Sequence, residues 1–70
     1  MKAILNMYNN YLKDVEVGVG DYIVANTDEF GLVEGCKYKI LEVNSYDMVT
    51  IEVYEGCTDI YSIEYFDEYK

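Results

Sequence analysis

The sequence predicts a small, mostly β domain. Four short segments rich in Val, Ile and Tyr are bounded by Gly, Asn or Asp, which is typical of strands joined by tight turns. Hydrophobic residues make up 51% of the 70 residues, enough to form a core and too many for a disordered acidic tail. We therefore expect one domain over residues 1–70, with strands at residues 21–25, 37–43, 48–54 and 59–63.

The N-terminal segment, residues 1–17, is harder to assign. Asn is a poor helix former, and Asn9-Asn10 would equally suit a turn between two strands. We favour a short helix within residues 3–14, because the apolar residues at helical spacing are Ile4, Leu5, Tyr8, Tyr11, Leu12 and Val15. Alternation at residues 15–17 then leads through a Gly-containing bend into the first strand of the main β region, residues 18–66.

The segment 48–54 gives the clearest strand. Alternate residues fall on opposite faces of a strand, and one face here is entirely apolar, with Val49, Ile51 and Val53. We expect this face to point into a core shared with Ile23, Ile40 and Ile63.

The connections between strands carry turn residues. Residues 44–47 should form a hairpin turn, and residues 55–58 should join the third strand to the fourth. The longer stretch 26–34, which contains Gly31, should be a loop of the kind that often carries binding residues.

Tyrosine is unusually frequent, with nine Tyr, two Phe and no Trp. We expect Tyr22, Tyr38 and Tyr61 in the core or the wall of the domain, because they lie among strand residues. A chain of this size cannot bury every phenol, and Tyr is favoured at protein interfaces. In residues 64–69 acids and aromatic rings are interleaved, a pattern that suits contact with the stems and charged heads of Lys or Arg.

The composition is strongly acidic: 14 Asp and Glu against 5 Lys give a net charge of −9. The acids concentrate in residues 42–70, which carry eight acids and one Lys. Such a surface repels nucleic acid and membrane head groups and attracts cationic proteins. Any single exposed acid is most simply a solvated surface residue, but the concentration favours a role in binding. The candidate partner-binding residues are Glu42, Glu52, Glu55, Asp59, Glu64, Tyr65, Asp67, Glu68 and Tyr69.

Enzyme function is not expected. Without His, the chain lacks the common general base, a Ser-His or Cys-His pair and an imidazole metal ligand. A pair of carboxylates could hydrolyse glycosides only in a cleft that so short a chain can hardly form. Cys36 and Cys57 are too few for a zinc site, and we expect them to be reduced thiols. Residues 14–21 do not reproduce a calcium loop. We therefore predict neither metal nor cofactor.

A longer pattern runs through residues 18–66. It consists of Gly20-Asp21-Tyr22-Ile23-Val24-Ala25, a loop, residues 35–43, a turn, residues 49–53, Tyr61 and Tyr65-Phe66. This pattern resembles the short SH3-like β-barrel proteins encoded by bacteriophages. The resemblance implies a partly open barrel of about five strands and says nothing about activity.

In charge and size the chain is also similar to the small acidic DNA-mimic inhibitors of bacteriophages. That likeness implies a partner among host proteins that bind DNA: a sliding clamp, polymerase, glycosylase, nuclease or nucleoid protein, met in the cytoplasm of an infected bacterial cell. Carboxylates would occupy the cations that normally hold phosphates, with no direct binding of nucleic acid or membrane.

The alternative is an SH3-like protein-interaction or virion accessory module without mimicry. A continuous anionic ridge would favour the mimic, whereas acids scattered around an apolar groove would favour the module. In either case a homodimer is a candidate assembly, because a second copy would supplement a small core.

Overall fold

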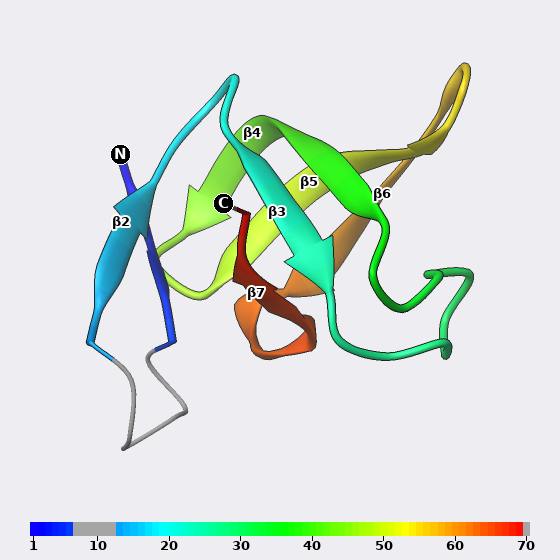
Figure 1. Cartoon of the computed structure of the whole chain (residues 1–70). Coiled ribbons are helices and arrows are strands. Elements are labelled where there is room, and N and C mark those ends of the chain that lie inside the picture. The colour runs from blue at the N-terminus through cyan, green and yellow to red at the C-terminus, as the bar shows by residue number, and fades with distance from the viewer. Residues whose placement is uncertain (7–12, 70) are drawn as a thin grey trace.

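The computed structural model describes residues 1–6 and 13–69, which form two antiparallel sheets (Figure 1). The smaller sheet pairs β1 (Ala3–Leu5) with β2 (Val15–Val17). The larger sheet has the strand order β6-β5-β4-β3-β7. Its strands are β3 (Tyr22–Ala25), β4 (Lys37–Ser45), β5 (Met48–Tyr54), β6 (Cys57–Ser62) and β7 (Phe66–Glu68), and the 3-10 helix η1 (Ile63–Tyr65) joins the last two.

The mostly β prediction is confirmed. The two outermost strands of the larger sheet, β6 and β7, are joined only by the three residues of η1. The sheet therefore curls so that its two ends approach each other, which is consistent with a partly open barrel (Figure 1). Among the described residues no helix is long and apolar enough to cross a membrane.

The central strands form two hairpins with two-residue turns. Ser45 pairs with Met48 across the first turn, and Tyr54 pairs with Cys57 across the second. The turn at Glu55-Gly56 needs a left-handed residue, which Gly56 supplies with a φ of 79°. Both turns lie where the sequence predicts them, although β6 begins two residues earlier than expected.

The core confirms most of the predicted inward positions. Val49, Ile51, Ile23 and Ile40 are fully buried, and Ile63 is buried beside them. The predicted core residue Val53 is only partly buried, because it lies towards the tip of the β5–β6 hairpin, which projects from the body of the molecule (Figure 1).

The predictions for the strand tyrosines are confirmed. Tyr38 and Tyr61 are buried, each with its ring edge-on to the ring of Phe66. Tyr22 lies in the wall of the domain, in β3, and not in the core, since its side chain is 41% exposed. Ile23 takes the inward position in β3, and the alternation of the strand then places Tyr22 on the outer face.

The prediction of an N-terminal helix is wrong, because residues 1–6 and 13–69 contain no α-helix and the segment contributes the strands β1 and β2. Ala3 and Leu5 alternate inward and are fully buried, so the segment belongs to the same core as the larger sheet. Asn9-Asn10, the alternative turn, lies outside the described residues, as do Tyr8, Tyr11 and Leu12.

Candidate functional site

A hollow of about 520 Å³ opens beside β6. Its volume falls within the range of ligand pockets, roughly 300 to 1,000 Å³. Apolar and aromatic side chains dominate its lining, together with one carboxylate. We call it the aromatic groove, and its residues are Phe30, Met48, Asp59, Ile60, Tyr61, Ser62 and Tyr65.

Three parts of the chain build the groove. β6 supplies the wall from Asp59 to Ser62, η1 supplies Tyr65, and the loop between β3 and β4 supplies Phe30. The expected loop at residues 26–34 is therefore confirmed, and it reaches the groove. Phe30 and Ile60 remain 59% and 51% exposed, so the groove presents apolar surface to solvent.

The conformation of the loop at Phe30 is unusual. Phe30 adopts a φ of 60°, a left-handed conformation that a bulky residue rarely takes, and Gly31 follows with a φ of 82°. Two contacts hold Phe30 in this conformation. Its carbonyl accepts a hydrogen bond from the Tyr61 hydroxyl, and the centre of its ring lies 5.1 Å from the centre of the Tyr65 ring. The backbone strain is therefore maintained by the same residues that line the groove.

Further contacts tether the rest of this loop. Leu32 is buried in the core, and the backbone amide of Val33 donates to the Tyr38 hydroxyl at 2.9 Å. The amide of Glu34 donates to the Asp28 carboxylate at 2.8 Å. These contacts fix the loop against the sheet, so the groove is formed before any ligand arrives.

Carboxylates act on the two phenols of the groove. Desolvation raises the pKa of Tyr65 above its ordinary value, and the charge of Glu64, hydrogen bonding to Glu64 and the charge of Glu29 raise it further. Burial raises the pKa of Tyr61, and the charge of Asp59 adds to the effect. Both phenols are therefore neutral near pH 7 beside three carboxylates, an arrangement that suits a cationic side chain.

The structure divides the nine candidate residues among several surfaces. Asp59 and Tyr65 line the aromatic groove, and Glu64 lies outside its lining but is hydrogen-bonded to Tyr65. Glu42 and Glu52 lie on the outer face of the β4–β5 pair, since Glu42 pairs with Thr50, two residues before Glu52. Asp59 pairs with the core residue Ile51, so its side chain lies on the opposite face of the sheet from Glu52.

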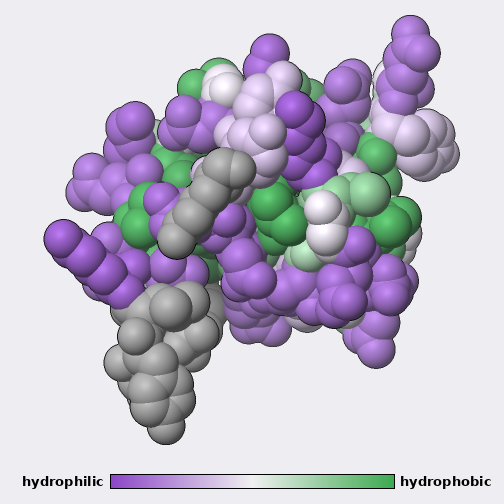
Figure 2. All heavy atoms as spheres, viewed as in Figure 1, coloured by the Kyte–Doolittle hydropathy of each residue, from purple (hydrophilic) through white to green (hydrophobic). Residues whose placement is uncertain are grey.

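The remaining candidates lie elsewhere. Glu55 occupies the tip of the β5–β6 hairpin, whereas Asp67, Glu68 and Tyr69 lie on or directly after β7. Asp67 has a structural contact, because the Asn26 amide donates to its carboxylate at 3.4 Å and to the Glu64 carbonyl at 3.0 Å. The candidate acids therefore do not form one continuous ridge, and Figure 2 shows hydrophobic side chains exposed among the hydrophilic ones on the face in view.

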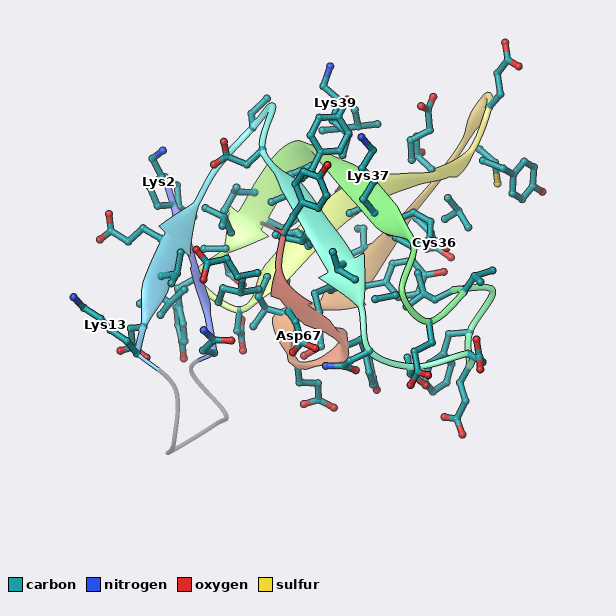
Figure 3. All side chains as sticks on the ribbon, viewed as in Figure 1. Lys2, Lys13, Cys36, Lys37, Lys39 and Asp67 are labelled. Atoms are coloured by element: carbon teal, nitrogen blue, oxygen red, sulfur yellow. The ribbon has the colours of Figure 1, made fainter. Side chains whose placement is uncertain are left out.

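Lysines gather on the outer face of β3 and β4. The Lys37 ammonium lies 4.9 Å from the centre of the Tyr22 ring and 5.1 Å from that of Tyr69. Lys39 pairs with Tyr22 and shares this face, and Figure 3 shows both lysine side chains leaving the sheet together. Tyr69 is therefore in contact with a cation of its own chain.

A second hollow, of about 330 Å³, lies between β2 and β7 and is lined in part by Glu16, Asp21 and Glu68. Within the described part of the chain, no group of three or more Asp, Glu or Cys side chains is arranged to hold a metal ion. Cys36 and Cys57 are free thiols.

Sequence reasoning missed Phe30, Met48, Ile60 and Ser62 as groove residues and placed Tyr61 only in the core or the wall of the domain. Ile60 could have been found, because it alternates with two inward residues of a predicted strand and must therefore face outward. Nothing in the sequence indicates that the loop and β6 meet.

No protein-family model, curated protein or solved structure matches this chain. The resemblance to phage SH3-like barrels and to acidic DNA mimics therefore stays a prediction.

Proposed function

We propose that this chain is an acidic protein-binding module that holds a basic segment of a cationic partner protein in the aromatic groove. The observation that carries the proposal is the juxtaposition of exposed apolar side chains, Phe30 and Ile60, with the carboxylate of Asp59 at one preformed hollow.

The two kinds of group would contribute differently. Fully burying a large apolar side chain is worth about 1.5 to 3 kcal/mol, so covering the half-exposed Phe30 and Ile60 would supply roughly 1 kcal/mol each. An exposed ion pair adds only about 0.2 to 1 kcal/mol. The apolar contacts would therefore provide affinity, whereas the carboxylates would select a basic segment and speed its approach.

The experiment uses a cationic partner captured from a bacterial lysate and then purified. Phe30→Ala should weaken its binding about fivefold, which corresponds to ~1 kcal/mol. Tyr54→Ala is the matched control, because Tyr54 is an aromatic residue that is 69% exposed and does not line the groove. Equal effects of the two variants would reject the groove as the docking site.

A second candidate function, DNA mimicry, is favoured by the net charge of −9 and by the shared outer face of Glu42 and Glu52. The partner would then be a DNA-binding host protein in an infected bacterium, and its DNA site would be blocked. The test is competition: DNA should displace the chain from the partner, and Glu52→Lys should weaken binding more than Phe30→Ala. A partner that binds DNA and this chain simultaneously would exclude mimicry.

A further inference from the structure

We infer that the basic segment binds by strand addition, joining the larger sheet as an antiparallel strand along the outer edge of β6. This inference rests on the proposed function of the aromatic groove and specifies how its ligand is held.

In the part of the chain that the structure describes, the outer edge of β6 is unpaired. β6 is the terminal strand of its sheet, and the amide of Ile63, directly after it, donates to the Asp47 carbonyl at 2.8 Å. The backbone N–H and C=O groups of successive strand residues point to opposite sides. Those of residues 59 and 61 therefore also point towards β5, and those of residues 58, 60 and 62 point away from it. Among residues 1–6 and 13–69, no backbone group pairs with these three on the outer side.

One of the outward amides is covered by a side chain. The amide of Ile60 donates to the carboxylate of Asp59 at 2.8 Å. Charged groups placed at a strand edge discourage pairing with another chain. An incoming carbonyl can replace this carboxylate, and the released Asp59 can then pair with a basic side chain of the same ligand.

The two faces of β6 define the ligand sequence. The side chains of Ile60 and Ser62 lie on the outer face of the sheet, and Ser62 pairs there with Met48. The side chains of Asp59 and Tyr61 lie on the other face, which is directed to the core and to Phe30. In an antiparallel pair, residues directly opposite each other share a face. Ligand residues opposite Ile60 should therefore be apolar, and their neighbours opposite Asp59 should be Lys or Arg.

Charge distinguishes this ligand from a second copy of the chain. Edge-to-edge pairing of two β6 strands would bring two Asp59 carboxylates towards each other in molecules that each carry −9. A basic segment with alternating apolar residues satisfies the same edge without that repulsion.

The test uses a fluorescent, end-capped peptide, Val-Lys-Val-Lys-Val-Lys, titrated with the intact chain and followed by fluorescence anisotropy. In antiparallel addition the Val residues direct their backbone groups to β6 and the Lys residues direct theirs away. N-methylation of the three Val amides should weaken binding at least tenfold, whereas N-methylation of the three Lys amides should change it less than threefold. The block peptide Val-Val-Val-Lys-Lys-Lys has the same composition and should bind at least tenfold more weakly.

A matched pair of variants tests the edge on the protein. The amide of Ser62 points outward and its φ of −68° is the value that proline prefers, so Ser62→Pro removes one edge donor without a backbone clash. Ser62→Ala is the control, since both variants lose the hydroxyl that accepts from the Glu64 amide. Ser62→Pro should bind the alternating peptide at least fivefold more weakly than Ser62→Ala, with the same thermal midpoint.

A second pair separates the inference from the proposed function. Asp59→Asn and Glu52→Gln remove equal charge, but only Asp59 lines the groove. A larger loss of peptide affinity for Asp59→Asn than for Glu52→Gln, together with no effect of N-methylation or Ser62→Pro, would overturn strand addition. The groove would then remain as the binding site. Equal losses from both charge variants would reject the groove itself. Failure of the alternating peptide to bind, or a dimer that Ser62→Pro converts to monomer, would also overturn the inference.

Discussion

The hydroxyl of Tyr61 donates a hydrogen bond to the carbonyl of Phe30, which ties a buried strand residue to the exposed turn of a loop. Because Phe30 adopts a left-handed φ, this bond helps to hold a conformation that would otherwise relax. The aromatic groove therefore depends on a contact between residues 31 positions apart in the chain.

Removing the hydroxyl of Tyr61 should make the loop more mobile without leaving a cavity in the core. Tyr61→Phe keeps the buried ring and deletes the donor, so we expect a loss of about 0.5 to 1.5 kcal/mol in the free energy of unfolding. Amide hydrogen exchange should become much faster at residues 29–33, while exchange in β4 and β5 should become faster only by the factor that the loss of global stability accounts for. Unchanged exchange in the loop would show that the bond does not hold it.

The core prediction concerns Ile51, which is fully buried in β5. Ile51→Ala should reduce the free energy of unfolding by ~2 to 5 kcal/mol, as is usual for a large-to-small change in a core. Ile60→Ala is the control on the neighbouring strand, and because Ile60 is 51% exposed its effect should be smaller than ~1 kcal/mol. Urea denaturation measures both, and a neutral Ile51→Ala would contradict the described core.

The N-terminal strands offer a separate test. Leu5 is fully buried although the segment carrying it is short, so Leu5→Ala should also cost about 2 to 5 kcal/mol. Ile4→Ala is the neighbouring control, since Ile4 is only half-buried on the other face of β1. A negligible effect of Leu5→Ala would mean that β1 and β2 are dispensable for the core.

Alkaline pH should destabilise the fold through Tyr61. Burial raises the pKa of this phenol in the folded chain above its value of about 10 in the unfolded chain. As pH rises, the unfolded state therefore loses the phenol proton before the folded state does. The stabilising contribution is therefore complete below pH ~10 and is lost as pH rises through the higher folded value. Urea unfolding across this range should show a shallower pH dependence for Tyr61→Phe than for the unchanged chain. Identical pH dependence would contradict a raised pKa at Tyr61.

The sequence predicts local features better than it predicts the site. Val49 and Ile51 are readable as core because strand alternation is a local pattern, and Gly56 marks its turn by itself. The N-terminal prediction fails because an apolar stripe of few residues fits both a helix and a strand, and burial of Leu5 against the rest of the core decides between them. The groove was not predictable, because it arises where Phe30 and Tyr65, distant in sequence, are brought together by the curl of the sheet.

One pair of charge reversals tests whether the aromatic groove is the docking site for a cationic partner. Asp59→Lys and Glu52→Lys change the net charge equally on opposite faces of the sheet. Because Glu52 does not line the groove and exposed charges are partly screened at ~0.15 M salt, Asp59→Lys should weaken binding of the purified partner at least tenfold and Glu52→Lys less than twofold. Equal losses of affinity, or a greater loss for Glu52→Lys, would show that the groove is not the docking site.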